Sequence, residues 1–371
     1  SYWQFQNITS IEEMFANCTN LENIELHGEF SGNIKNAFLN CTSLERINID
    51  RVTTRLTDLS SLFSGCTNIK TASLNGSDDA DLVLKGDFSG VTTMANMFNG
   101  CTSLEKVEIK GDFSALTNAN SLFNGCSVLT SADIDFEKDA LTNMASMFKN
   151  CSAITSATIG DGDDANVTIK GDFSKVTTLQ ETFNGCSALE DVEINGDFSK
   201  LTNISSVLNG NTALKTAKLD GTFSSLTSLA SLFSGKTNLT NATLKGDFSS
   251  VGSLKELFLN CSSLTSAILD ADFESANNLQ STFNGCTALP TVTLKGDFSN
   301  VTTTAHMFRN CKALTEATLD GEFGAALTDM RYMFGACESL ESISLSKDGD
   351  DSDVSLKGDF SKVKTLQDMF N

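Results

Sequence analysis

Cysteine recurs along this chain at a nearly constant interval. The cysteines are Cys18, Cys41, Cys66, Cys101, Cys126, Cys151, Cys186, Cys261, Cys286, Cys311 and Cys337. Most neighbours lie 23 to 26 residues apart, two intervals are 35, and the gap of 75 after Cys186 holds Asn211 and Lys236 at the two vacant positions. We call these thirteen positions the comb. A fixed period of this length is typical of tandem arrays in which each repeat contacts only its neighbours.

Composition limits what such an array can bind. The chain has 26 basic and 47 acidic residues, a formal charge of −21, which argues against nucleic acid because that binding depends on Lys and Arg. No apolar run approaches the roughly 18 residues of a membrane span. We expect one solenoid over 1–371, and the start at Ser1 without Met indicates a fragment of a longer repeat array.

Each repeat predicts one short strand. After Cys101, the apolar residues Leu104, Val107 and Ile109 end in an alternating pattern that favours a parallel strand with one face buried. The trio Gly111-Asp112-Phe113 follows, and it predicts a turn that returns the chain to the core. Twelve of the 26 phenylalanines lie three positions before a comb position, and Phe370 lies three before the next one expected, at 373. Most others belong to the Gly-Asp-Phe trio, so two phenylalanine columns should fill the core.

The segment before each comb position predicts a short helix. Val91, Met94, Met97, Phe98 and Cys101 are spaced i, i+3, i+6, i+7 and i+10, as on one helical face. The expected architecture is therefore an α/β solenoid of about 13 repeats of ~25 residues. Short parallel strands form one face and short helices form the other.

The pattern Met-Phe-x-x-Cys-x-x-Leu-x-x-Ile-x-Ile resembles the BspA-like, or treponemal-class, leucine-rich repeats. Met97, Phe98, Cys101, Leu104 and Val107 match it in order. The resemblance implies a right-handed leucine-rich-repeat array and a surface protein associated with adhesion to host cells or matrix. It implies no catalytic residues.

An odd number of cysteines, one per repeat, favours free buried thiols over a disulfide framework. Disulfides remain the alternative, because stacked repeats bring equivalent Cα atoms to about 4.8 Å. Lys236 fits a comb position only if its stem reaches water.

Acidic insertions lie within the long spacings and near the end of the chain, near 75–85, 160–170 and 347–357. Each reads as a hairpin or extra strand with an acidic tip. The tips are Asp78, Asp79 and Asp81; Asp161, Asp163 and Asp164; and Asp348, Asp350, Asp351 and Asp353. Closely spaced carboxylates are ligands for Ca²⁺, so these ten residues are metal candidates and calcium is the only cofactor suggested. A solvated turn is the alternative.

Three further features stay open at this stage. A column of aspartates, from Asp87 to Asp359, predicts either turn capping or a binding column. Eleven Asn-x-Ser/Thr triplets, at Asn7, Asn17, Asn40, Asn75, Asn150, Asn166, Asn203, Asn238, Asn241, Asn260 and Asn300, are glycan candidates if the protein is a eukaryotic secreted one. The single proline, Pro290, falls at the start of a strand and predicts a local irregularity.

An enzyme is not expected, since His27 and His306 lie in unrelated repeats and no catalytic motif accompanies them. We expect an extracellular or cell-surface scaffold that mediates adhesion to a host or matrix protein or to a glycan. The alternative is a structural subunit whose copies polymerise end to end into a filament or coat, because no polar capping unit precedes the end at Asn371.

Overall fold

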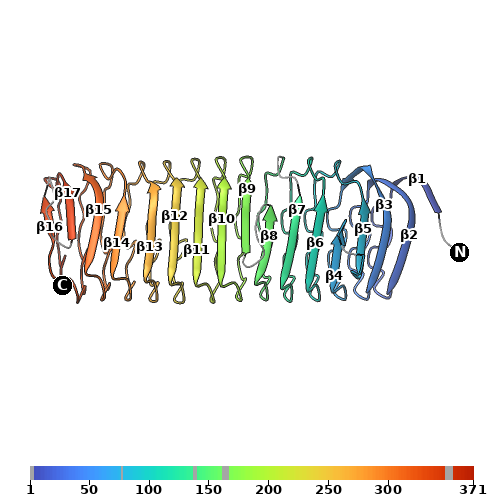
Figure 1. Ribbon diagram of the computed structural model, residues 1–371, viewed down its shortest axis with the longest axis horizontal. Coiled ribbons are helices and arrows are strands. Elements are labelled where there is room, and N and C mark those ends of the chain that lie inside the picture. The colour runs from blue at the N-terminus through green and yellow to red at the C-terminus, as the bar shows by residue number, and fades with distance from the viewer. Residues whose placement is uncertain (1–3, 77, 137–139, 161–166, 347–353) are drawn as a thin grey trace. The chain divides into compact units, whose positions relative to one another are not determined.

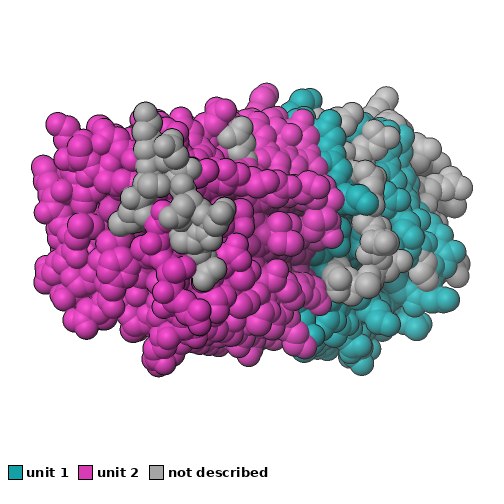
Figure 2. Space-filling view, turned by 60° about the vertical axis from the view of Figure 1, so that its left-hand side comes forward, with its two compact units in different colours: residues 1–190, 205–211 teal, residues 191–204, 212–371 magenta. Residues whose placement is uncertain are grey.

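The computed structural model describes residues 4–76, 78–136, 140–160, 167–346 and 354–371. The chain divides into two compact units, coloured separately in Figure 2. Unit 1 comprises Ser1–Glu190 and Ser205–Asn211, and unit 2 comprises Asp191–Ile204 and Thr212–Asn371. Each unit is a β-solenoid, and together they contain about 11 turns of repeat, against the 13 expected.

All strand pairs described here are parallel, as predicted (Figure 1). Unit 1 holds β1 (Gln4–Ser10), β2 (Asn23–Asn33), β3 (Arg46–Asp58), β4 (Thr71–Leu74), β5 (Leu82–Gly86), β6 (Lys106–Gly111), β7 (Ser131–Phe136), β8 (Ser156–Gly160) and β9 (Val167–Asp172). Unit 2 holds β10 (Asp191–Asp197), β11 (Thr216–Thr222), β12 (Asn241–Asp247), β13 (Ser266–Asp272), β14 (Thr291–Lys295), β15 (Glu316–Phe323), β16 (Ser344–Ser346) and β17 (Val354–Gly358).

Alternation along each strand fixes the core. In β6, Val107 and Ile109 are buried while Glu108 and Lys110 are half-buried on the outward face. Pairing without a register shift keeps equivalent residues in line, as in Val107↔Ala132 and Ile109↔Ile134. Because side chains alternate with a period of two, the same register aligns the outward residues into rows.

Each insertion adds an extra parallel strand to the sheet. Strand β5 lies between β3 and β4, because it pairs with both, and β4 in turn pairs with β6. Strand β17 likewise pairs with both β15 and β16, and β9 pairs with β8. The extra-strand interpretation of the insertions therefore holds for these three segments, without a hairpin.

The predicted helices are absent: within the described ranges no segment is helical. The segment from Met94 to Cys101 instead forms successive β-turns, with hydrogen bonds Met97 N to Met94 O and Cys101 N to Phe98 O, both 3.1 Å. Asn96 and Gly100 stand third in these turns with φ of 58° and 73°, as type II turns require.

Alternate amides of this segment donate to the next repeat, as Met94 N does to Asn118 O and Phe98 N to Leu122 O, both 2.9 Å. An α-helix would have kept those donors within its own turn of chain. Apolar residues three positions apart fit a run of β-turns, whose closing hydrogen bonds join residues three apart, as well as they fit a helix. This explains why the helix prediction was wrong.

The comb cysteines tie successive repeats together. All eleven are free thiols, as the sequence favours. Cys126 Sγ donates to Phe98 O of the preceding repeat at 3.1 Å, and Cys261 Sγ donates to Phe233 O at 3.0 Å. Asn211 keeps this bond through Nδ2, which donates to Phe183 O at 3.1 Å. The phenylalanine columns also form as predicted, with Phe98 and Phe123 stacked at 5.6 Å between ring centroids.

Candidate binding face

The outward face of unit 2 carries rows of polar side chains in register. The middle row runs through the third residue of each strand and consists of Glu193, Lys218, Thr243, Ile268, Thr293 and Thr318. At its start, Lys218 Nζ bonds Glu193 Oε1 at 3.0 Å and Asp220 Oδ2 at 3.3 Å. Both contacts raise the pKa of Lys218, so the amine is charged and already paired.

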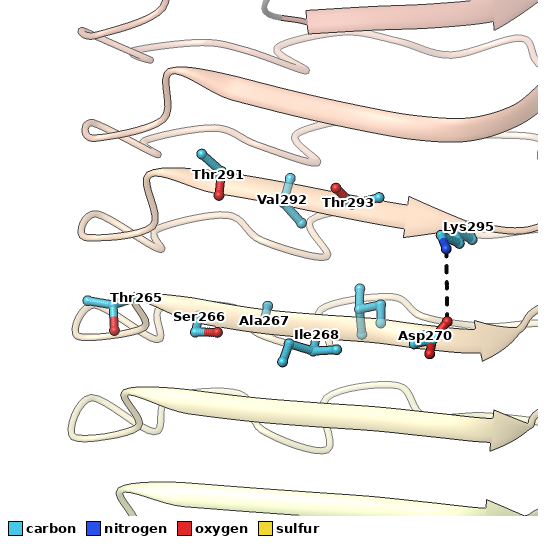
Figure 3. A pocket seen from close by; sticks show the side chains of 10 residues that line it. Thr265, Ser266, Ala267, Ile268, Asp270, Thr291, Val292, Thr293 and Lys295 are labelled. Carbon is cyan, nitrogen blue, oxygen red and sulfur yellow. Dashed lines mark ion pairs between the residues drawn. The ribbon is translucent and has the colours of Figure 1, made fainter.

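Ile268 interrupts this polar row. Its side chain is 52 % exposed, although its neighbours in the row are threonines. It lines a hollow of about 420 Å³ over β13 and β14, together with Thr265, Ala267 and Thr293 (Figure 3). At one end of the hollow Asp270 faces Lys295, with their charged atoms 4.0 Å apart.

The hollow coincides with a gap in the strand ladder. Strands β12 and β13 are joined by seven register pairs, but β13 and β14 only by Ile268↔Thr293 and Leu269↔Leu294. Ala267 is half-buried there, whereas the equivalent Ala242 is 1 % exposed. The pairing between β13 and β14 is therefore open at this point, and part of β13 is exposed.

Pro290 explains the gap. In the preceding repeat the amides of Thr265 and Ser266 donate to Thr240 O at 3.0 and 3.1 Å. Pro290 stands at the position of Thr265 and has no amide hydrogen. Among the backbone hydrogen bonds between described residues, none reaches Thr265 O. The irregularity predicted at Pro290 is thus an open ladder with a free carbonyl acceptor beside an exposed isoleucine.

Unit 1 presents a more acidic outward face. Lys110 Nζ joins two carboxylates of the face, Glu108 at 2.5 Å and Asp133 at 3.4 Å. A second hollow of about 300 Å³ lies beside them and includes Asp79 from the first insertion. Ser73 lines this hollow, is 1 % exposed, and its hydroxyl has no hydrogen-bond partner among the described residues. The insertion therefore covers part of the outward face.

The described acidic residues of the first insertion do not converge. Asp78 pairs with Lys85, and Asp81 Oδ2 accepts from the amides of Lys70 and Thr71, both at 3.3 Å. Across the described ranges, no group of three or more His, Cys, Asp or Glu side chains is arranged to hold a metal ion.

The other metal candidates fall on the second and third insertions. Asp161, Asp163, Asp164, Asp348, Asp350, Asp351 and Asp353 lie outside the described residues. Calcium binding at these tips stays a prediction.

The aspartate column caps turns. Asp112 Oδ1 accepts a hydrogen bond from the amide of Ser114 at 2.8 Å, and Asp87 Oδ1 accepts one from the amide of Ser89 at 2.9 Å. Hydrogen bonds from the Ser114 side chain and amide lower the pKa of Asp112. These carboxylates have local partners, which favours the turn-capping interpretation over a binding column.

Four of the Asn-x-Ser/Thr triplets have a structural explanation. Asn17, Asn40, Asn150 and Asn260 directly precede a comb cysteine and have φ between 57° and 62°. Glycine fills this position in other repeats, as Gly100 does, because few other residues adopt a positive φ. Glycosylation of the triplets stays a prediction.

Comparison with known proteins identifies the family. A family model described as "Mycoplasma protein of unknown function, DUF285" matches residues 1–71, 32–161 and 227–348, well over half of the sequence. The chain belongs to this DUF285 family. A model described as "BspA type Leucine rich repeat region (6 copies)" matches residues 165–279, which confirms the predicted resemblance. A search of curated proteins finds no match.

Bacterial leucine-rich-repeat proteins are among the solved structures similar to this chain. A leucine-rich repeat protein of Bacteroides ovatus is 19 % identical over 95 % of this chain and 87 % of its own, with a TM-score of 0.40. A leucine rich cell surface protein of Faecalibacterium prausnitzii is 19 % identical over 85 % and 82 %, with a TM-score of 0.31. The family assignment itself rests on the sequence models.

The described residues contain no helix long and apolar enough to cross a membrane. The DUF285 chain is a leucine-rich-repeat scaffold, a fold suited to interaction with proteins or other ligands. Ile268 is a site residue that the sequence analysis did not identify. The signal was present: in Ser-Ala-Ile-Leu the isoleucine occupies an outward position of the strand.

Proposed function

We propose that this chain is an extracellular or cell-surface adhesion module that binds a partner protein on the outward face of unit 2. The observation that carries the proposal is the hollow around Ile268, which combines an exposed branched side chain with an open strand ladder. A partner that places an apolar side chain against Ile268 removes apolar surface from water on both sides.

The polar groups around the hollow favour a polypeptide occupant. The free carbonyl of Thr265 can accept a backbone amide of the partner, and Asp270 and Lys295 offer one charge of each sign at the far end. Tight interfaces combine an apolar centre with a polar rim. Thr243, Thr293 and Thr318 supply such a rim along the middle row.

The test is binding of the purified chain to immobilised extracellular-matrix proteins, with matrix glycans as a parallel set. We expect saturable binding to a matrix protein, weakened about fivefold by Ile268→Thr, since roughly half of an isoleucine side chain is available for burial. Threonine occupies the same position in the neighbouring repeats, so the variant should fold.

Val128→Thr is the matched control, because Val128 is also an exposed apolar residue, at 40 %, but lies in unit 1. Binding confined to glycans would refute a protein partner. Binding that Ile268→Thr and Val128→Thr weaken equally would refute the hollow as the contact point.

A further inference from the structure

A second surface of unit 2 departs from the repeat in a different way. It lies on the turn segments, five residues before the comb. This column is occupied by small polar or acidic residues in eleven earlier repeats: Glu13, Asn36, Ser61, Asn96, Ser121, Ser146, Glu181, Ser206, Ser231, Glu256 and Ser281. Two aromatic residues, His306 and Tyr332, then take the position, and Asp368 follows them with its carboxylate hydrogen-bonded to the Tyr332 side chain.

The backbone conformation at this column is set by the turn and is the same whichever side chain is present. Every member of the column has a positive φ, which is 59° at His306 and 53° at Tyr332. Serine and asparagine serve the fold at the same position, and histidine is among the residues that adopt this conformation more often than most. The two rings are therefore not required for the turn to form.

The rings hold an arginine in place. His306 and Tyr332 stack with ring centroids 5.0 Å apart and an interplanar angle of 6°. Arg309 lies over the Tyr332 ring, with its Cζ 5.2 Å from the centroid. We call His306, Arg309 and Tyr332 the aromatic patch.

Arg309 is available for an anion. Its side chain is exposed, and its guanidinium pairs with no carboxylate in the part of the chain that the structure describes. The nearby cations are already paired: Arg331 Nη2 lies 2.8 Å from Asp329 Oδ2, and Lys312 Nζ lies 2.8 Å from Glu338 Oε1. Arg309 therefore differs from these two neighbours in that its guanidinium contacts an aromatic ring and no carboxylate among the described residues.

We propose that the aromatic patch is a second binding site, which receives a carboxylate side chain from a partner protein. The guanidinium is planar and binds carboxylate oxygens through two parallel hydrogen bonds. Tyrosine and arginine are the residue types that contribute most to protein interfaces. The ring beneath Arg309 orients it and reduces the entropy lost on binding.

The site can be tested with a small peptide while the natural partner is unknown. The probe is the blocked peptide Gly-Glu-Glu-Gly, with Gly-Gln-Gln-Gly as its uncharged match, titrated at physiological salt. The chain has five arginines, Arg46, Arg51, Arg55, Arg309 and Arg331, so their side-chain Nε–H signals are few enough to assign by NMR. We expect the Arg309 signal to shift to saturation with the glutamate peptide only.

Three variants use residues that other repeats carry at equivalent positions, so folding should be preserved. Arg309→Asn should weaken binding about tenfold or more, because a charge-assisted hydrogen bond is lost. Tyr332→Ser and His306→Ser should each weaken it about two- to fivefold through loss of the ring support. Asn99→Arg in unit 1 adds an arginine without aromatic neighbours and should gain no binding.

Equal shifts of all five arginine signals would overturn the proposal, because they would indicate unspecific attraction. Backbone-amide shifts of residues 306–332 that the glutamate peptide still produces in Arg309→Asn would overturn it as well. A sulfated disaccharide that saturates the Arg309 signal while the glutamate peptide does not would show that the partner is a glycan, and would refute the protein carboxylate.

Discussion

Replacing Pro290 with threonine should close the hollow on unit 2 while leaving stability almost unchanged. A threonine amide at 290 can donate to Thr265 O, as Thr265 N donates to Thr240 O at 3.0 Å. The ladder should then regain the pairs Ser266↔Thr291 and Ala267↔Val292 that the equivalent strands possess. Ala267 should become as buried as Ala242, which is 1 % exposed.

Two effects on the free energy of unfolding oppose each other. The restored hydrogen bond should stabilise the protein by about 0.5–1.5 kcal/mol. Loss of proline gives the unfolded chain more conformational freedom and should destabilise the protein by about 0.4–1 kcal/mol. The net change is therefore about 1 kcal/mol or less, whereas the shape of the binding face changes strongly.

Hydrogen exchange of the amide of residue 291 reports the closure. We expect exchange about fivefold slower in Pro290→Thr than in the wild type, from one additional hydrogen bond of about 1 kcal/mol. Partner binding at Ile268 should fall in parallel. Unchanged exchange together with a half-buried Ala267 would refute proline as the cause of the gap.

Thr265→Pro is the reciprocal control. It removes the amide that donates to Thr240 O at 3.0 Å and should open an equivalent hollow between β12 and β13. The proline also restricts the unfolded chain, but this stabilisation should not fully offset the loss of the native hydrogen bond.

Two further predictions concern the comb. Burial raises the pKa of Cys186 to about 12, which leaves ~10⁻⁴ of this thiol as thiolate at pH 8. Ellman's reagent should therefore modify exposed Cys18 quickly and the buried thiols only after unfolding. Rapid reaction of several thiols in the folded protein would contradict this. Burial lowers the pKa of Lys236, so burying its charged form opposes folding. The melting temperature of the wild type should therefore rise as the pH increases towards 10.5. Lys236→Met should be more stable than the wild type near pH 7 and should lack that rise.

The sequence predicted the strands well because their evidence is redundant. Val107 and Ile109 alternate with outward residues, and the comb repeats this arrangement at a known interval. The free thiols, the phenylalanine columns and the turn-capping aspartates followed from the same repetition. In a solenoid, one correctly read repeat determines its neighbours.

The turn segments were misread because spacing alone does not separate a helix from a series of turns. The signal that distinguishes them is the type of residue between the apolar positions. Asn96 and Gly100 are residues that accept a positive φ, and their recurrence every few residues opposes a continuous helix. The amides of these segments donate to carbonyl oxygens of the next repeat. These acceptors depend on how the repeats stack, so the sequence of one repeat does not reveal them.

Departures from the repeat contain most of what is specific to this chain. Because the repeats are alike, positions that follow the pattern give each repeat nearly the same surface. Such positions cannot mark one repeat as the binding site of a particular partner. The two proposed sites instead arise where the pattern fails: Pro290 opens the ladder beside Ile268, and the turn column changes from serine to His306 and Tyr332. Neither change is required by the repeat, since other repeats form the same strand and the same turn with threonine and serine at these positions. Returning these positions to the residues of neighbouring repeats should therefore preserve the solenoid and remove its binding.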